Sequence, residues 1–312
     1  MTDAVLLMAY GSPDRLEQVE AYYTDIRRGN PPPPELLEEL VERYRAIGGG
    51  SPLSRIVEEQ RAALAAELGR RGRRGRPMPV YAGMKHIAPF IRDVVVAMAD
   101  DGVERAVAIA LAPQASSMSS ATYRRAVETA AEALGDRAPA FRFVESWHDQ
   151  PRFVEALAAA TREALTRFPD PARVQVLFTA HSLPARIIGA GDPYPRELAR
   201  TAELVAARLG LPEHGFAYQS AGRTEEAWLG PDLGDEIRRL AKAGVRELVV
   251  CPVGFVADHL EVLYDIDIEA QAVAREEGMR LERARSMNAD PTFIAGIADL
   301  VEGSLPIEVV RR

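Results

Sequence analysis

Short apolar runs recur along the chain, and each is followed by a longer stretch in which apolar and polar residues are mixed. Runs of aliphatic and β-branched residues without polar positions between them are typical of parallel strands that are buried on both faces. We therefore predict strands at 4–9, 79–82, 105–112, 141–145, 174–180, 215–219 and 246–253.

The stretches between these runs have apolar residues three and four positions apart, which is the spacing of an amphipathic helix. We predict helices at 14–28, 35–46, 52–69, 88–101, 117–134, 151–167, 193–209, 232–243 and 257–276. Strands that alternate with helices indicate an α/β fold of doubly wound parallel sheets, because two parallel strands need a crossover connection.

Two pairs of segments in the chain resemble each other. LLMAYGSP at 6–13 is similar to LFTAHSLP at 177–184, and DGVERAVAIALAP at 101–113 is similar to AGVRELVVCP at 243–252. In both pairs a predicted strand runs directly into a loop that contains glycine or proline. Chance similarity between apolar strands is the alternative to a true repeat.

We interpret the repeat as two similar Rossmann-like lobes, 1–148 and 149–300, followed by a tail at 301–312. The last helix would then pack back on the first lobe. Ligands of such folds bind outside the carboxyl ends of the strands, so we expect a cleft between the lobes.

The composition excludes several classes of protein. Of 312 residues, 47% are hydrophobic and 27% charged, as in a globular protein with a large core. Cys251 is the only cysteine, which rules out an internal disulfide, a four-cysteine zinc site and a four-cysteine iron–sulfur cluster. No G-x-G-x-x-G follows a strand and neither lysine precedes Ser or Thr, so nucleotide-binding motifs are absent from the sequence.

The sequence also bears on the cellular location of the protein. No apolar run approaches the roughly 18 residues of a membrane-spanning helix. The first residues lack the basic segment of a signal peptide. We therefore expect a cytoplasmic protein without an integral membrane segment.

The negative charge of the chain is concentrated in one segment. The formal charge is −8, which argues against a nucleic-acid partner. Residues 225–282 contain 14 acidic and 6 basic residues, a balance that equals the charge of the whole chain. No lysine or arginine occurs between 247 and 274. Such a local field attracts divalent cations and is weakened by salt.

His181 directly follows the strand predicted at 174–180, so its imidazole belongs at the carboxyl edge of a sheet. Imidazole ligates borderline metals and accepts protons near neutral pH. A lone histidine is more often structural, and its position alone leaves both interpretations open.

Carboxylates follow the last predicted strand. In the helix predicted at 257–276, they are three, four and four residues apart and so share one face: Asp258, Glu261, Asp265 and Glu269. Like charges at this spacing destabilise a helix, which favours a path for cations or protons over a plain solvated face.

Tyr10 directly follows the strand predicted at 4–9. A phenol at a strand end can stack on a ring, donate a hydrogen bond or ligate iron as phenolate. Guanidinium groups and hydroxyls further along the chain suit the binding of carboxylates. These candidate residues, each weak by itself, are Arg27, Arg43, Tyr44, Ser51, Lys85 and His86.

Together the candidates lie in blocks that resemble the ferrochelatases, the enzymes that insert Fe²⁺ into a porphyrin. The resemblance extends over nearly the whole chain, in the blocks MAYGSP, YYTDIRRG, RYRAIGGGSPL, GMKHIAPF, LAPQASS, VESWHD, AHSLP, GDPYP, YQSAGRT, AWLGPDL and PVGFVADHLEVLYDID. The tyrosine in MAYG, with IRRG and KHI, is similar to the coproporphyrin ferrochelatases of Gram-positive-type bacteria. The single cysteine departs from relatives with a [2Fe–2S] cluster and implies that none is bound.

The resemblance implies a role for each matched position. His181 and Glu261 match the pair on the metal-entry side of the porphyrin, where one group receives iron and the other accepts pyrrole protons. Which group does which stays open. Tyr10 matches the residue on the opposite face that becomes an axial ligand of the inserted iron.

Other matched positions surround these. Positions that contact the macrocycle or its propionates are matched by Arg27, Arg43, Tyr44, Ser51 and Tyr123, and a pair beside the pocket is matched by Lys85 and His86. Asp265 and Glu269 match outer acidic residues of a helix that forms a metal or proton path and carries a π-type distortion in the family.

The resemblance implies insertion of Fe²⁺ into coproporphyrin III, which yields coproheme in haem b biosynthesis. Iron is then a substrate and no cofactor is required, with room for a hydrated Mg²⁺ or other divalent ion at the acidic helix. The enzyme is expected to be monomeric and to pass its product to a coproheme decarboxylase. The alternatives are a protoporphyrin IX ferrochelatase, a chelatase for cobalt or nickel, and a porphyrin-binding protein without catalysis.

Overall fold

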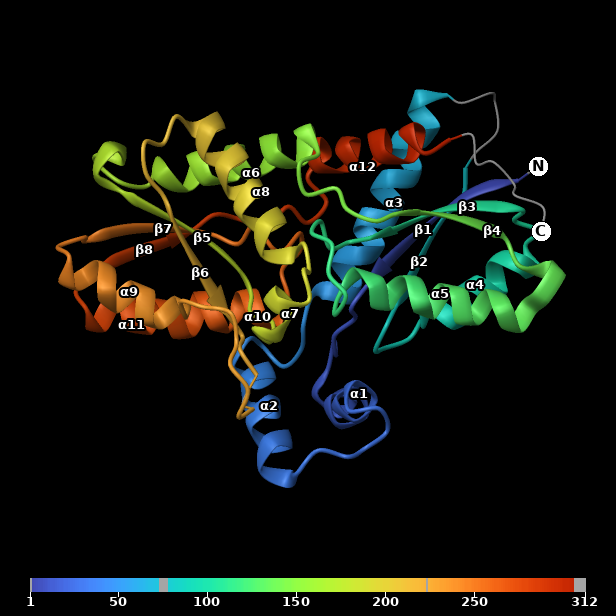
Figure 1. Ribbon diagram of the computed structural model, residues 1–312, viewed down its shortest axis with the longest axis horizontal. Helices are drawn as coiled ribbons and strands as arrows, with labels where there is room; N and C mark the ends of the chain where they lie inside the picture. Colours follow the sequence, from blue (N-terminus) through green and yellow to red (C-terminus); the bar gives the residue numbers. More distant parts are fainter. Residues whose placement is uncertain (1, 73–77, 223, 306–312) are drawn as a thin grey trace. The chain divides into compact units, whose positions relative to one another are not determined.

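The computed structural model describes residues 2–72, 78–222 and 224–305, which contain two four-stranded parallel sheets (Figure 1). The chain divides into two units, each with its own sheet. The first contains the chain up to Trp147 together with the segment from Asn288 onward, and the second is His148–Met287. The predicted α/β fold class is confirmed. The end of the predicted tail, 306–312, lies outside the described residues.

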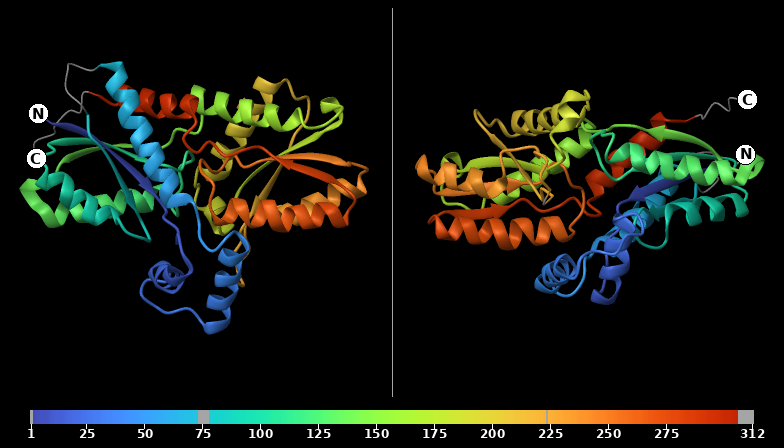
Figure 2. Two further views of the ribbon diagram at one scale, coloured as in Figure 1. Left: turned by 180° about the vertical axis from the view of Figure 1, so that it is seen from behind. Right: turned by 60° about the horizontal axis from the view of Figure 1, so that its bottom comes forward.

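The first unit has the strand order β2-β1-β3-β4, in which β1 is Asp3–Ala9, β2 Val80–Met84, β3 Arg105–Ala110 and β4 Ala140–Val144. Helices α4 (Ile91–Asp100) and α5 (Ser120–Leu134) pack on one face, and α3 (Leu53–Arg71) and α12 (Pro291–Gly303) on the other (Figures 1 and 2). Because side chains alternate along a strand, Leu6 and Met8 join Met98 and Val127 in one core cluster.

Two helices of the first unit lie beyond the carboxyl end of β1 (Figure 1). A 3-10 turn at Leu16–Gln18 leads into α1 (Val19–Ile26), and α2 (Pro34–Ala46) follows, with proline in its first turn. Proline suits that position because the first backbone N–H groups of a helix have no partner in the helix.

The second unit repeats the topology with the order β6-β5-β7-β8. Its strands are β5 (Gln175–His181), β6 (Gly215–Gln219), β7 (Glu247–Cys251) and β8 (Arg280–Arg283). Helices α6 (Pro151–Leu165) and α8 (Tyr194–Leu209) lie on one face, and α9 (Leu233–Lys242), α10 (Leu260–Leu263) and α11 (Gln271–Glu276) on the other (Figure 1). The short α7 (Arg186–Gly189) follows β5, and 3-10 turns occur at Gly135–Arg137 and Pro171–Arg173.

The repeated segments of the sequence occupy equivalent places in the two sheets. In each sheet the first strand pairs with the two strands that follow it, so β1 corresponds to β5 and β3 to β7. The two resembling segment pairs contain these strands. The repeat is therefore a repeat of structure, as predicted.

The seven predicted strands are present, with ends that differ by at most two residues. Strand β8 was not predicted, because its sequence RLER is short and only Leu281 is apolar. Residues 288–300, which the predicted ranges placed with the second lobe, group with the first unit. There α12 packs on α3, where Arg71 pairs with Asp299 at 2.8 Å and with Glu302 at 2.9 Å.

The predicted helix at 257–276 is wrong in its start, whereas the π-type distortion that the resemblance implied is present. The helix begins at Leu260, since the backbone of His259 is extended. A π-helical turn, Asp265–Ala270, then separates α10 from α11. Within it the N–H of Glu269 donates to the carbonyl of Tyr264, five residues back, at 2.9 Å. No helix among the described residues combines the length and the apolar character needed to cross a bilayer.

Candidate active site

His181 is the last residue of β5, and the chain around it is closely packed. Gly254, after β7, passes so near to this strand that a Cβ at that position would lie 2.6 Å from the Cβ of Ala180. Glycine is therefore required there. Tyr194 of α8 donates a hydrogen bond to the carbonyl of His181 at 3.0 Å. These contacts fix the backbone that carries the imidazole.

The structure brings His181 and Glu261 together. The Nδ1 atom of His181 lies 3.1 Å from Oε2 of Glu261, and both side chains are about one-third exposed, at 31% and 33%. The same carboxylate oxygen lies 3.5 Å from Nε2 of His259. Sequence reasoning missed His259, although the H-x-E spacing in DHLE was a usable signal. Glu261 is thus flanked by two histidines.

The two groups shift each other's pKa toward an ion pair. Burial lowers the pKa of His181, but the nearby charge of Glu261, its hydrogen bond and the charge of Asp265 outweigh burial and raise the pKa above its ordinary value. Burial raises the pKa of Glu261, whereas both flanking histidines lower it, and the net shift is strongly downward. The charge of Glu261 therefore favours the protonated form of His181, and the imidazole favours the ionised form of Glu261.

The acidic residues of the π-helical turn differ in exposure. Asp265 is buried and accepts a hydrogen bond from Ser220, whereas Glu269 is exposed. The backbone carbonyl of Glu261 accepts a hydrogen bond from Gln219 at 2.5 Å. Carboxylates on this segment thus range from the surface to the interior.

The predicted four-carboxylate stripe is wrong for Asp258. Because the helix begins at Leu260, Asp258 lies in the preceding loop. Its Oδ1 atom is 3.2 Å from the guanidinium of Arg283, a pairing that the sequence did not reveal.

Tyr10 directly follows β1 in the first unit, at the place that corresponds to His181 in the second. Gly11 has a φ of +83°, and a Cβ there would lie 2.7 Å from the side chain of Ile87. This close approach lets the loop after β2 run along the strand end, where the N–H of Lys85 donates to Ala9 at 2.9 Å. The N–H of His86 donates to the carbonyl of Tyr10 at 3.0 Å.

Aromatic rings and one cation surround Tyr10. Its ring centroid is 4.5 Å from that of His86 and 6.4 Å from that of Tyr22. The Nζ atom of Lys85 lies 5.7 Å from the Tyr10 centroid, within reach of a cation–π interaction. Tyr10 itself is 41% exposed, so its ring remains accessible.

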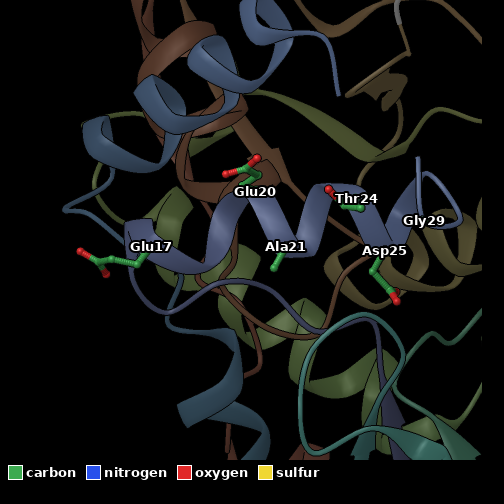
Figure 3. Close-up of a pocket in the computed structure, with 6 residues that line it drawn as sticks. All are labelled: Glu17, Glu20, Ala21, Thr24, Asp25 and Gly29. Carbon is green, nitrogen blue, oxygen red and sulfur yellow. The ribbon is translucent and has the colours of Figure 1, made fainter. Parts of the chain in front are cut away.

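His86 is buried and pairs with Asp25 of α1 through Nδ1 at 2.7 Å. Burial lowers the pKa of His86 below its ordinary value, and the hydrogen bond that Asp25 accepts offsets this only in part. Sequence reasoning missed Asp25. Figure 3 shows its carboxylate at the edge of a hollow of about 520 Å³ along α1, which Glu17, Glu20 and other residues line. Three of the six residues that line this hollow are acidic, which does not suit an anionic ligand.

Positive charge gathers near the same strand end. Burial lowers the pKa of Lys85, and the charges of Arg125 and Arg28 lower it further. The Nε atom of Arg27 is buried and makes no hydrogen bond within the described part of the chain. Excess cationic charge of this kind is relieved when carboxylates bind.

The remaining predicted residues of the first unit are mostly below the surface. Tyr44 is 1% exposed, and its hydroxyl lies 2.7 Å from Oγ of Ser12 in the loop after β1. Ser51 is buried and its N–H donates to Pro13, while Tyr123 packs in the core. Arg43 is partly exposed, 3.4 Å from Glu39. Tyr44 and Ser51 therefore support the strand-end loop from beneath.

Comparison with known proteins identifies the family. The sequence model of the ferrochelatases matches residues 2–305. A ferrochelatase of Thermus thermophilus is 49% identical, over 97% of this chain and 99% of its own length. The chain belongs to the ferrochelatase family. It is a metal chelatase, a lyase whose substrates are a porphyrin and iron, as the resemblance implied.

Further relatives carry a more specific name. Proteins of Geobacillus kaustophilus and Halalkalibacterium halodurans, 44% and 42% identical over 96% of this chain and 95% and 96% of their own lengths, are named coproporphyrin III ferrochelatase. Among solved structures, SirB from Bacillus subtilis with Fe³⁺ matches with a TM-score of 0.60 at 12% identity, over 98% of this chain and 96% of its own. That likeness shows the chelatase fold alone.

The family gives the His181–Glu261 pair a context in metal chemistry. In the part of the chain that the structure describes, no group of three or more His, Cys, Asp and Glu side chains is arranged to hold a metal ion.

Proposed function

We propose that the chain inserts Fe²⁺ into coproporphyrin III and releases coproheme and two protons. The observation that carries the proposal is the His181–Glu261 ion pair at 3.1 Å. The pair places a borderline metal ligand next to a carboxylate. The relatives named coproporphyrin III ferrochelatase support this choice of porphyrin.

In the proposed reaction, the second unit handles iron and protons. Each pyrrole N–H bond that breaks gives its proton to a base, and each nitrogen lone pair that results binds Fe²⁺. His181 and Glu261 would take up and pass on these protons, since the imidazole and the carboxylate are in contact. The carboxylates Glu269 and Asp265 would lead hydrated Fe²⁺ or protons toward the pair, and a hydrated Mg²⁺ could share this path.

The first unit would bind the macrocycle. Coproporphyrin III has four carboxylates around a flat apolar ring, and Arg27, Arg43 and Lys85 supply cations for them. Tyr10 presents an accessible phenol that would face the ring and ligate the inserted iron. His86 would hold Tyr10 in place, while Tyr44, Ser51 and Tyr123 shape the loops around it.

The test of the porphyrin is a comparison of Fe²⁺ insertion rates with coproporphyrin III and protoporphyrin IX under anaerobic conditions. We expect at least about a tenfold preference for coproporphyrin III, because its two additional carboxylates make charge-assisted hydrogen bonds. Arg27→Leu should reduce this preference, whereas Arg92→Leu on α4, where Arg92 pairs with Asp93, should not. Faster turnover of protoporphyrin IX would contradict the proposal.

Other metals and the absence of catalysis are tested in the same assay. The proposal predicts insertion of Fe²⁺ faster than of Ni²⁺, whereas a nickel chelatase would show the reverse order and a non-catalytic carrier would show no insertion. The proposed enzyme is a cytoplasmic monomer without a resident cofactor or iron–sulfur cluster, and it hands coproheme to a decarboxylase. A mixture with that enzyme should consume coproheme without release into solution.

A further inference from the structure

Arg283, the last residue of β8, joins two acidic residues on either side of Glu261 in the sequence. Its Nε and Nη2 atoms contact the two carboxylate oxygens of Asp267 at 2.7 and 2.9 Å, a bidentate geometry. Its Nη1 atom lies 3.2 Å from Oδ1 of Asp258. The Arg283 side chain is only 15% exposed, so these contacts are largely shielded from solvent.

Ser286 completes the group. Its hydroxyl donates to Oδ1 of Asp258 at 2.7 Å, and the Nη1 atom of Arg283 lies 3.4 Å from the hydroxyl oxygen. Burial lowers the pKa of Arg283, but the hydrogen bond and charge of Asp267 outweigh it, and the net shift is upward. We call these four residues, Asp258, Asp267, Arg283 and Ser286, the Arg283 clamp.

The Arg283 clamp spans the segment that carries the acidic residues of the site. Asp258 precedes α10, and Asp267 lies inside the π-helical turn between Asp265 and Glu269. A π-helical turn is an unusual backbone that its surroundings have to hold in place. No lysine or arginine occurs from 247 to 274. The cation that pairs with the carboxylates of this segment is therefore Arg283, from β8.

We propose that Arg283 is a positioning residue that fixes the segment 258–269 so that the Glu261 carboxylate stays on His181 for the metal. This inference rests on the proposed function of that pair. Bidentate pairing needs the planar fork of arginine, and lysine cannot replace it. Arg283 also keeps Asp258 and Asp267 engaged, so that these carboxylates do not draw the divalent ion away from Glu261.

The experiment compares Arg283→Lys and Arg283→Met with the wild type. We expect the KM for Fe²⁺ to rise about tenfold in Arg283→Met and less in Arg283→Lys, because a loosened segment loses its preorganisation. The KM for the porphyrin should stay within about twofold. The matched control is Arg285→Met two residues away, whose side chain is 43% exposed and pairs with Glu163. Unchanged iron kinetics, or an equal rise in both KM values, would overturn the inference.

A second measurement does not need turnover. Titration of the metal-free protein with Co²⁺ should show binding about tenfold weaker in Arg283→Met than in the wild type. Asp267→Asn should weaken Co²⁺ binding equally, and the double variant should be no worse than either single one, because the two residues act as one unit. Equal or tighter Co²⁺ binding, or additive losses, would refute the clamp. If the wild type did not insert iron but Co²⁺ binding changed in the variants as expected, only the proposed function would be contradicted.

Discussion

The strands β1 and β5 occupy the same place in two sheets of the same order, yet they end in different chemistry. Tyr10 follows the first and His181 ends the second. In each case a glycine, Gly11 or Gly254, allows another loop to approach the strand end more closely than any side chain would permit. The shared backbone frame therefore fixes where a functional residue stands, and the residue type decides what it does.

The surroundings of the two strand ends differ in charge as well. Near Tyr10 there are aromatic rings and the cation Lys85, which lies close to Arg28 and Arg125. Near His181 there are carboxylates, which raise the pKa of the imidazole. The first set suits a flat anionic ring and the second suits a divalent cation and protons. The repeat thus separates the two substrates of the proposed reaction by charge.

The largest effect on the reaction is expected for His181→Ala. Removing the imidazole removes a proton acceptor and a metal ligand at once, so iron insertion should fall by at least about 10²-fold. Porphyrin binding, which the comparison assigns to the first unit, should remain within about tenfold by fluorescence titration. The matched control is His214→Ala, a histidine that packs on Phe178 and should leave insertion unchanged. Retained turnover in His181→Ala would refute the assigned role.

Tyr10→Phe tests the other strand end. The variant keeps the ring and loses the phenol oxygen, so insertion should change by less than about tenfold while the absorption spectrum of the bound product shifts, because the iron loses its axial ligand. Tyr81→Phe in β2, whose hydroxyl donates to Asp101, should leave both unchanged. An identical product spectrum in Tyr10→Phe would mean that Tyr10 does not ligate the iron.

Glu261→Gln tests whether the charge of Glu261 raises the pKa of His181. Burial is the strongest influence on His181 and lowers its pKa, so without the charge of Glu261 the pKa should fall from above 6.5 to below it. The imidazole carbon-bound protons, followed by NMR in the metal-free protein, report this directly. Glu282→Gln, at a carboxylate that pairs with Arg280 and Arg167, should not move the titration. An unchanged midpoint would show that Glu261 does not set the charge of His181.

Sequence patterns predicted the frame of the molecule and the residues at strand ends. Buried parallel strands have apolar runs that are easy to recognise, and a residue directly after such a run has to lie at the edge of the sheet. The strand β8 lacked that signal, since as a strand at the sheet edge it has charged residues around Leu281. Periodicity does not detect a π-helical turn, so the one at Asp265–Ala270 was expected only from the resemblance to the family.

Pairings between distant residues were beyond the sequence. Asp25 and His86 are 61 positions apart and meet only because the loop after β2 runs past α1. Arg283 reaches Asp258 and Asp267 from another strand in the same way. Local periodicity cannot predict contacts between residues that are far apart in the sequence. By contrast, His259 lies two residues from Glu261, so their contact could have been predicted from the sequence.

The Asp25–His86 pair gives the smallest expected effect, on stability instead of activity. In the unfolded chain His86 titrates near 6.5, whereas burial holds its pKa lower in the folded protein. The unfolded chain therefore binds the proton first as the pH falls, and the contribution of neutral His86, complete above 6.5, is lost on acidification. Urea unfolding just above and about one unit below 6.5 should show a steeper loss of stability in the wild type than in His86→Gln. Equal slopes would mean that folding does not shift the pKa of His86, and a shallower loss in the wild type would mean that folding raises it, as at His181.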